Sequence, residues 1–196
     1  GSLICLSAAD GKPVWTASMT ELGGKVPGWG YCESPLVEGN LVIATPGGPQ
    51  GTLAAFDKTT GKLAWQSAEW TDPAQYSSLI AVTHNEARQL IQLTMQSIAG
   101  VNAADGKLLW KTEFPGKTAV IPTPIFKDGQ VFVAAGYGVG CKLIKLSEGK
   151  AETVYENKTM VNHHGGVILV GDYLYGYSEG GGWTCQDFKT GAEKWA

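Results

Sequence analysis

A hairpin pattern that ends in tryptophan recurs along the chain and constrains its fold more than any other feature. The segment "AAFDKTTGKLAW" at 54–65 has an alternating apolar run, a turn signal and a second run that ends in Trp65. Four similar segments end in an aromatic residue at the same point of the pattern: Trp15, Trp110, Tyr155 and Trp195. Successive aromatic residues are 50, 45, 45 and 40 positions apart. A period in this range, built from short strands, is typical of sheets repeated radially around an axis, with four strands per blade.

Each repeat also predicts four short strands. In the second unit, the segments "SPLVEG", "NLVIATPGG", "TLAAFDKTTG" and "KLAWQS" follow one another and are joined by turn signals rich in Gly, Pro and Asn. No segment has a convincing helical period. We therefore predict an all-β protein, a β-propeller of four-stranded antiparallel blades, with four full blades and one outer hairpin in this chain. The predicted repeats of this single domain, 1–196, cover residues 3–19 (half a blade), 33–68, 76–113, 120–158 and 165–196.

Two further positions recur with the tryptophans. A glycine lies four residues before each one: Gly11, Gly61, Gly106 and Gly191. A small residue lies ten residues before each one: Cys5, Ala55, Gly100 and Cys185. The glycine permits the positive φ of a tight hairpin, and we expect the small residue to leave space for a large ring from a neighbouring unit. The tryptophan would then lie between adjacent blades, and a core position inside its own sheet is the alternative.

The composition argues against several classes of function. A net charge of −3 gives no basic surface for nucleic acid, and no apolar run approaches the roughly 18 residues of a membrane span. The four cysteines, Cys5, Cys32, Cys141 and Cys185, have no CxxC spacing, which weakens both a zinc site and a redox motif. We interpret Cys5 and Cys185 as small buried side chains rather than a disulfide. No targeting segment precedes the first repeat, so the sequence itself indicates no compartment.

The hairpin resembles the tryptophan-docking repeat of the quinoprotein dehydrogenase propellers, also called the PQQ-like repeat. Ala55, Gly61 and Trp65 fit the Ala/Gly/Trp pattern of that family fully. The other tryptophan-ending units fit with a substituted first position. The unit that ends at Tyr155 departs from the pattern, because Gly149 lies six residues before the aromatic residue. The repeat pattern therefore does not predict that blade interface.

The resemblance covers nearly the whole chain and carries further expectations. Family members usually have six to eight blades, so the resemblance implies that these 196 residues are a fragment of a longer member. The open faces of the terminal blades would then be covered by the missing blades of the parent chain or by a second copy in a homo-oligomer. The alternative is that the four full units close tightly, with the amino-terminal hairpin as an accessory. The resemblance also implies an extracytoplasmic location, periplasmic or secreted. The same propeller serves alcohol oxidation and noncatalytic scaffolding, so the fold alone does not choose between them.

Candidate site residues lie in the loops that lead into the innermost strand of each blade. These loops are "GWGYCES", "DPAQYSS", "AVIPTP" and "VNHHGG", and they occupy equivalent positions in successive units. We predict that eight of their residues converge near one funnel as a binding site: Trp29, Tyr31, Glu33, Gln75, Tyr76, Asn162, His163 and His164. The alternative is that Glu33, Tyr76 and the histidines hydrogen-bond neighbouring blades and hold the ring together.

The loops give little support for metal or phosphate chemistry. His163 and His164 are adjacent, and on a strand they would point to opposite faces, so they could not both bind one ion without a bend. Glu33 and Asp72 are the only carboxylates among these loops, and we predict no metal site. The segment "GYGVG" at 136–140 has spaced glycines but no following helix, so it does not predict a phosphate cradle. No GxSxG is present, and spacing nominates no catalytic residue.

We predict a noncatalytic propeller that binds a protein, peptide or glycan through its funnel or its blade edges, without a cofactor. The alternative is a quinone-dependent dehydrogenase, which would need PQQ on a tryptophan floor, calcium to polarise it and an aspartate base. Such enzymes carry a vicinal cysteine pair, and this chain has none. A third hypothesis is a hydrolase or lyase in which His163 or His164 acts as a base.

Overall fold

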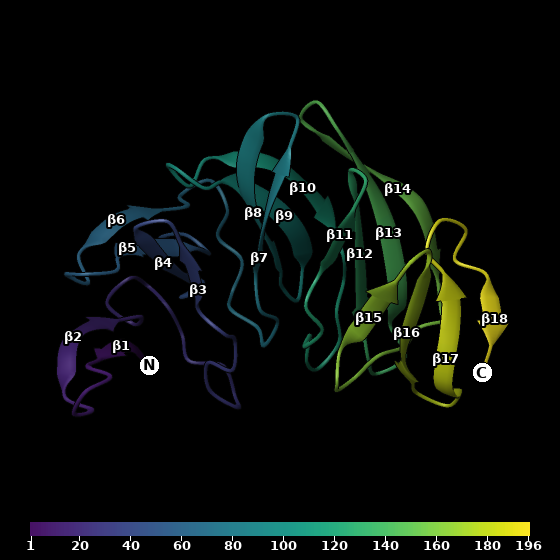
Figure 1. Ribbon diagram of the computed structural model, residues 1–196, viewed down its shortest axis with the longest axis horizontal. Coiled ribbons are helices and arrows are strands. Elements are labelled where there is room, and N and C mark those ends of the chain that lie inside the picture. The colour runs from purple at the N-terminus through teal and green to yellow at the C-terminus, as the bar shows by residue number, and fades with distance from the viewer.

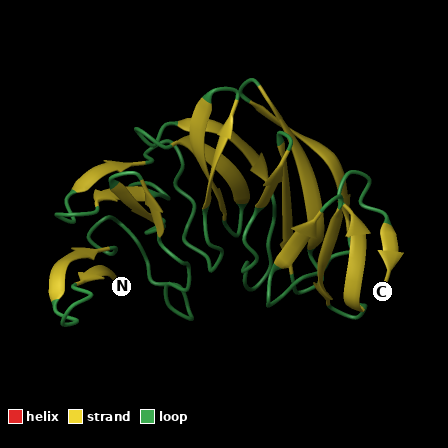
Figure 2. Cartoon of the chain, viewed as in Figure 1, coloured by secondary structure: helices red, strands yellow, loops and turns green.

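The computed structural model describes residues 1–196 and contains β-strands and loops but no helix (Figure 2). Eighteen strands form one two-stranded sheet and four four-stranded sheets, all antiparallel. The predicted all-β class and the four full blades with one additional hairpin are confirmed. No helix is available that is long and apolar enough to cross a membrane.

The sheets are numbered here as blades 1 to 5 in chain order. Blade 1 is the hairpin of β1 (Ser2–Leu6) and β2 (Pro13–Ser18). Blade 2 contains β3 (Leu36–Glu38), β4 (Leu41–Ala44), β5 (Ala54–Asp57) and β6 (Leu63–Gln66). Blade 3 contains β7 (Ile80–His84), β8 (Ala87–Leu93), β9 (Ser97–Asn102) and β10 (Leu108–Glu113).

Blade 4 contains β11 (Ile125–Lys127), β12 (Gln130–Ala135), β13 (Gly140–Ser147) and β14 (Lys150–Asn157). Blade 5 contains β15 (Val167–Val170), β16 (Tyr173–Ser178), β17 (Gly182–Asp187) and β18 (Glu193–Trp195). Each four-stranded blade is a meander in which every strand pairs with the next strand in the chain. Figure 1 shows the blades following one another along an open arc, with the two chain ends at opposite ends of the arc.

The core lies between the blades, because each sheet has two faces to cover. The largest apolar cluster has 12 buried residues and joins blades 3 and 4, through side chains such as Ile91 and Ile144. A second cluster of 9 buried residues joins blades 2 and 3. Blade 5 packs on blade 4 through Leu174 and Phe132, and blade 1 packs on blade 2 through Leu3 beside Phe56. The arc is therefore held together by sheet-on-sheet burial.

A five-residue turn joins the last two strands of most blades and explains the recurring glycine. In blade 2, Asp57 Oδ1 accepts hydrogen bonds from the backbone N–H groups of Thr59 and Thr60, at 3.0 and 2.8 Å, and from the Thr60 hydroxyl. The N–H of Gly61 donates to the carbonyl oxygen of Asp57, at 2.8 Å, and Gly61 has a φ of 69°. Because L-residues adopt this φ only with strain, the turn favours glycine here.

Aromatic rings from one blade lie over these glycines in the next blade, an arrangement that we call a docking contact. Atoms of the Trp15 ring lie against Gly61, and atoms of the Trp65 ring lie against Gly106. Trp15 Nε1 also donates a hydrogen bond to the carbonyl oxygen of Lys58 in blade 2, at 2.9 Å. Tyr155 has the same relation to Gly191, at the corresponding position of blade 5. At the ends of the arc, a Cβ atom on Gly11 would have no other atom within 4 Å, and Trp195 is 51% exposed.

The small residue ten positions before each tryptophan has its cross-strand partner within its own blade. It lies directly opposite the tryptophan of its own blade, in the cross-strand pairs Cys5–Trp15, Ala55–Trp65, Gly100–Trp110 and Cys185–Trp195. At Gly100, the nearest atoms to a Cβ would belong to the Trp110 ring. The expectation that this residue makes room for a neighbouring unit is therefore wrong at Gly100, because the ring folds back over its own sheet. All four cysteines are free thiols.

Candidate functional site

The interblade loops enclose an open cavity of about 400 Å³, which we call the aromatic cavity. Eight residues line it: Trp29, Cys32, Tyr76, Ala119, Ile121, Tyr137, His163 and His164. They come from the β2–β3, β6–β7, β10–β11 and β14–β15 connections and from the β12–β13 turn. These connections lead into or belong to blades 2, 3, 4 and 5, so the cavity exists only because these blades stand side by side. Its lining is mainly aromatic and aliphatic.

Four of the eight predicted site residues meet in this cavity, namely Trp29, Tyr76, His163 and His164. Cys32, Ala119 and Ile121 lie in the same predicted loops but were not predicted, since small and aliphatic side chains carry no chemical signal in a sequence. Tyr137 was missed for a different reason. It lies in the "GYGVG" turn. From the sequence, this segment is considered only as a candidate phosphate-binding motif, because of its spaced glycines, and its tyrosine is not considered.

Trp29 and Tyr76 form one wall of the aromatic cavity. Their ring centroids are 5.6 Å apart with an interplanar angle of 63°, a favourable edge-to-face arrangement. The backbone N–H of Trp29 donates to the hydroxyl oxygen of Tyr76 over 3.4 Å, which joins the β2–β3 loop to the β6–β7 loop. Tyr76 is 8% exposed, whereas Trp29 is 66% exposed. Trp29 therefore offers a large free aromatic surface at the mouth of the cavity.

His163 and His164 form the opposite part of the lining and stack on each other. Their ring centroids are 4.0 Å apart with an interplanar angle of 18°, and Tyr137 lies 4.2 Å from the His163 ring. On a strand the two rings would point to opposite faces, but this stretch is a loop with a bend. Gly165 and Gly166, with φ values of 82° and 70°, bend the chain directly after the pair. The bend places both imidazoles on the same cavity.

Glu179 fixes the position of this aromatic group without lining the cavity. Its Oε1 lies 3.2 Å from His163 Nδ1 and accepts a hydrogen bond from the backbone N–H of Tyr137 at 3.0 Å. Its Oε2 accepts from the N–H of Gly138 at 3.2 Å. Tyr137 has a φ of 56°, an uncommon conformation for a non-glycine residue. These bonds hold the tyrosine in that conformation and orient His163.

Tyr31 and Glu33 lie apart from the aromatic cavity, in a small pocket of about 110 Å³ next to blade 1. Glu33 accepts hydrogen bonds from the N–H and the hydroxyl of Thr45, the latter at 2.6 Å, and from Gln92 Nε2 at 3.2 Å. Burial raises the pKa of Glu33 to about 7, although the bonds from Thr45 act in the opposite direction. Tyr31 donates its hydroxyl proton to the carbonyl oxygen of Pro46, at 3.1 Å. Both residues tie loops of the first blades together.

Gln75 and Asn162 also make internal contacts rather than lining the cavity. The Oε1 of Gln75 accepts a hydrogen bond from the N–H of Val120, at 3.3 Å. Asn162 is fully buried, and its Nδ2 donates to the carbonyl oxygens of Tyr177 and His164, at 3.0 and 3.2 Å. These bonds hold the β6–β7 and β14–β15 loops in the shape that the cavity requires. These contacts give Gln75 and Asn162 a structural role, an alternative that the sequence raised only for Glu33, Tyr76 and the histidines.

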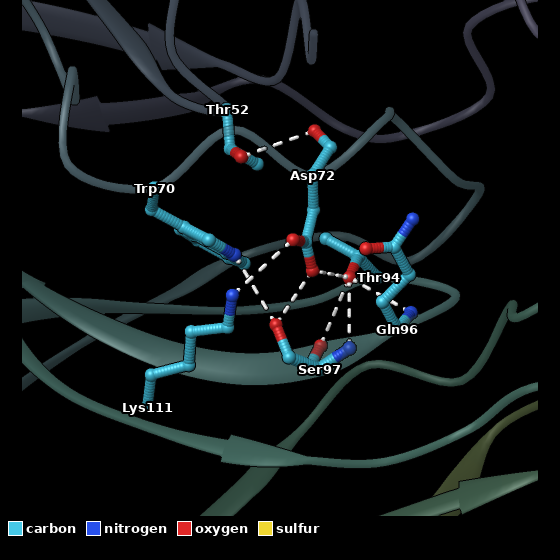
Figure 3. Close-up of polar contacts among 7 residues, drawn as sticks. All are labelled: Thr52, Trp70, Asp72, Thr94, Gln96, Ser97 and Lys111. Carbon is cyan, nitrogen blue, oxygen red and sulfur yellow. Dashed lines mark hydrogen bonds and ion pairs between the residues drawn. The ribbon is translucent and has the colours of Figure 1, made fainter. Parts of the chain in front are cut away.

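A buried aspartate organises the connection between blades 2 and 3 (Figure 3). Asp72 Oδ2 accepts hydrogen bonds from the hydroxyls of Thr94 and Ser97, both at 2.6 Å, and Oδ1 lies 3.4 Å from Lys111 Nζ. Trp70 Nε1 donates to the Ser97 hydroxyl at 3.2 Å. Burial acts to raise the pKa of Asp72, but the bonds from Ser97 and Thr94 outweigh it and hold the pKa below its usual value. Since its partners occupy the carboxylate, Asp72 has a structural role.

The lining of the aromatic cavity does not fit a calcium–quinone centre. Calcium prefers carboxylate and carbonyl oxygen ligands, and no carboxylate lines the cavity. No lysine or arginine lines it either, so no side chain there could pair with an anionic cofactor. In the whole chain, no group of three or more His, Cys, Asp or Glu side chains is arranged to hold a metal ion.

The family model described as outer membrane protein assembly factor BamB matches residues 1–196. The chain belongs to this family. The crystal structure of BamB from Moraxella catarrhalis is similar to the chain with a TM-score of 0.68 and 18% identity, over 100% of this chain and 54% of that one. A quinohemoprotein alcohol dehydrogenase, ADHIIG from Pseudomonas putida HK5, is similar with a TM-score of 0.64 and 14% identity, over 98% of this chain and 38% of that one. No curated protein matches the sequence.

A designed protein shares the fold as well. The computationally designed Ika8 protein is similar with a TM-score of 0.60 and 14% identity, over 93% of this chain and 51% of that one. At these identities the likeness concerns the fold, which is a β-propeller of the PQQ-like repeat type. The chain thus spans about half the length of the BamB structure and of the designed propeller. The resemblance found in the repeat is confirmed.

Proposed function

We propose that the chain is a noncatalytic binding module that takes up a protein or peptide partner through the aromatic cavity and the loops around it. The supporting observation is the convergence of five connections on one open cavity with an exposed Trp29 at its mouth. Interfaces between proteins are enriched in Trp, Tyr and other large side chains at their centres. Membership of a family described as an assembly factor supports a protein partner as the occupant.

The cavity favours an apolar or aromatic side chain over a charged one. No Asp, Glu, Lys or Arg side chain lines it, and its volume of about 400 Å³ lies in the lower part of the range for ligand pockets. A partner would place one bulky side chain between the Trp29–Tyr76 wall and the stacked histidines. The polar backbone of the loops would provide the rim of the interface.

A selection from a random peptide display library tests this proposal. The chain offers a matched control, because Trp183 on blade 5 is 69% exposed and Trp29 is 66% exposed. We expect peptides selected on the unaltered protein to bind Trp29→Ala at least about tenfold more weakly and Trp183→Ala unchanged, as for a central interface residue. Selected peptides that ignore Trp29→Ala would contradict the proposal. A glycan array provides the second arm of the test. If glycans bind in a way that requires Trp29 and no selected peptide does, the partner is a glycan rather than a peptide.

A hydrolase or lyase is the second candidate function, favoured by the contact between His163 and Glu179. A carboxylate at 3.2 Å from Nδ1 orients the imidazole and leaves Nε2 to take a proton, as in many acid–base sites. No carboxylate lines the cavity as a partner acid, which places this function second. Turnover of a glycan panel that His163→Gln abolishes, with unchanged folding by circular dichroism, would establish it. Glu179→Gln should then reduce the turnover without abolishing it.

The terminal blades support a further proposal about partners, namely that their open faces are covered either by further blades of the parent chain or by a second copy. On blade 5, Ile168, Val170, Tyr177 and Trp183 are 55–69% exposed, and on blade 1, Ile4, Leu6 and Val14 are 51–58% exposed. Apolar faces of this kind mark contact surfaces. The mass in solution tests this point, since a stable monomer of this 196-residue chain would exclude the second copy.

By family membership we propose an extracytoplasmic location, which a fusion of the parent protein to a compartment reporter would test.

A further inference from the structure

The contact between blades 3 and 4 lacks the docking contact that the other complete interfaces have. At Gly61, Gly106 and Gly191, a Cβ atom would overlap the ring of Trp15, Trp65 or Tyr155. Gly149 is the glycine of the corresponding hairpin in blade 4, with a φ of 63°, and no atom lies within 4 Å of its Cβ position. The place where an aromatic ring would lie over this hairpin is therefore open.

The hairpin of blade 4 explains why Trp110 does not fill this place. β13 and β14 are joined by a tight turn in which Ser147 pairs with Lys150, in place of the five-residue turn of the other blades. Trp110 instead folds over Gly100 of its own blade, and its Nε1 donates to Gln89 Oε1 at 2.7 Å. The ring is only 5% exposed. Since Trp110 is already buried and hydrogen-bonded, it has no reason to move across to Gly149.

A cavity of about 290 Å³ remains at this interface, which we call the interblade cavity. Trp110, Leu109 and Leu146 give it an apolar wall, and Gly149 lies at its edge. His84 also lines it, and the Nε2 atom of His84 is buried without any hydrogen-bond partner. Buried polar atoms of side chains nearly always have a partner. Because this nitrogen has almost no accessible surface, it is closed to a ligand in the cavity, and the apolar wall is what a ligand would meet. Such a wall suits a flat aromatic ring.

We propose that the interblade cavity binds a tryptophan or tyrosine side chain presented by an extended segment of a partner polypeptide. The ring would lie between Trp110 and the Gly149 hairpin. The occupant follows from the fold itself, which places a tryptophan or tyrosine from an extended strand over the equivalent glycine at three other interfaces. This site is separate from the aromatic cavity, since the two share no lining residue.

Titration with N-acetyl-tryptophanamide, followed by amide chemical shifts in NMR spectra, tests the proposal. We expect saturable shifts at Ala87 and Gly149 with this probe and none with N-acetyl-leucinamide. Equal binding of the two probes, or shifts confined to residues of the aromatic cavity, would overturn the proposal.

Two variants separate the interblade cavity from the aromatic cavity. Ala87→Phe adds a ring to a residue that lines the interblade cavity and should abolish the shifts. Trp29→Ala removes a wall of the aromatic cavity and should leave them unchanged. Loss of binding in Trp29→Ala and retention in Ala87→Phe would place the probe in the wrong cavity and refute the assignment. The comparison between the two probes requires no variant, so it decides the question even where Ala87→Phe does not fold.

Discussion

The interfaces of blades 2 and 3 and of blades 3 and 4 come from the same repeat but are held together differently. Between blades 2 and 3, the Trp65 ring lies over Gly106, and Arg88 forms two 2.8 Å hydrogen bonds with Glu38. Gln92 Nε2 adds a bond to the Thr45 hydroxyl, at 2.8 Å. Between blades 3 and 4, no ring lies over Gly149, yet the apolar cluster is larger, with 12 buried residues against 9.

The difference shows that the docking contact is one of two ways to join neighbouring blades. Long strands β13 and β14 present aliphatic side chains such as Ile144 and Leu146 to blade 3. Burial of such side chains stabilises a contact by roughly 1.5–3 kcal/mol each. Aliphatic packing near the middle of the sheets therefore replaces the docked ring. As a result, the interblade cavity next to the β13–β14 hairpin is left unfilled.

The largest expected effect comes from removing Trp110. Trp110→Ala should lower the free energy of unfolding by about 3–5 kcal/mol, because it leaves a cavity and removes the partner of Gln89. Trp65→Ala should cost less, roughly 1.5–3 kcal/mol, since the ring is only half-buried. Trp195→Ala is the control, and its exposed ring predicts a change within about 0.5 kcal/mol. Urea unfolding measures all three, and a smaller loss for Trp110→Ala than for Trp65→Ala would refute the comparison.

The next effect concerns pH and the interface of blades 2 and 3, where Gln92 contacts Glu33. Because burial raises the pKa of Glu33 from 4.5 to about 7, the folded chain holds this proton more tightly than the unfolded chain. The resulting stability is fully present below about pH 4.5 and is lost as the pH rises through about 7. We expect the free energy of unfolding to fall by up to about 3 kcal/mol between pH 4.5 and 8.

Glu33→Gln isolates this contribution, because the amide does not titrate. In the variant, that part of the decrease between pH 4.5 and 8 should be absent. Asp72 does not interfere, since its pKa is lowered and its contribution is lost only as the pH falls below the usual range of a carboxyl group. An unchanged pH dependence in Glu33→Gln would show that Glu33 is not the group responsible.

The sequence predicted the fold well because the repeat depends on interactions between residues that are close together in the chain. The five-residue turns, the glycine with positive φ and the alternating strands each depend on neighbours in the chain, as around Asp57 and Gly61. The direction of each ring was less predictable. Trp65 and Trp110 end nearly identical segments, yet one docks on the next blade and the other folds over its own Gly100. The turn at Ser147–Lys150, one blade further along, decides between the two.

The candidate site was predictable only in part, for a similar reason. The position of the loops followed from the repeat, so Trp29, Tyr76 and the histidine pair were found. Which side chains point into the cavity depends on contacts across blades. The bond from Gln92 Nε2 of blade 3, for example, holds Glu33 away from the cavity. The bend after His164 depends on two consecutive glycines with positive φ, which a strand-based interpretation of "VNHHGG" does not include.

A glycine comparison tests the docking contact directly. Gly106 and Gly149 have similar φ values, 73° and 63°, so alanine brings similar backbone strain at both positions, on the order of 1 kcal/mol. Only at Gly106 would the new methyl group also overlap the Trp65 ring. We expect Gly106→Ala to cost about 1–3 kcal/mol more than Gly149→Ala, by the usual penalty of overpacking. Gly11→Ala, with a φ of 71° and open space around it, should match Gly149→Ala. If urea unfolding shows the same loss of free energy of unfolding for Gly106→Ala and Gly149→Ala, the Trp65 ring moves aside without destabilising the chain.

The smallest expected effect is that of the ion pair between Arg88 and Glu38. Both of its hydrogen bonds are 2.8 Å long, but Arg88 is 44% exposed, so water screens the pair. A double-mutant cycle with Arg88→Ala and Glu38→Ala should give a coupling of about 0.5–1 kcal/mol at low salt. The coupling should decrease in about 0.5 M sodium chloride, where charges are screened over a few ångströms. A coupling above about 3 kcal/mol that salt does not change would contradict this expectation. The interface of blades 2 and 3 would then differ from that of blades 3 and 4 mainly through its polar bonds, and not through the Trp65 contact.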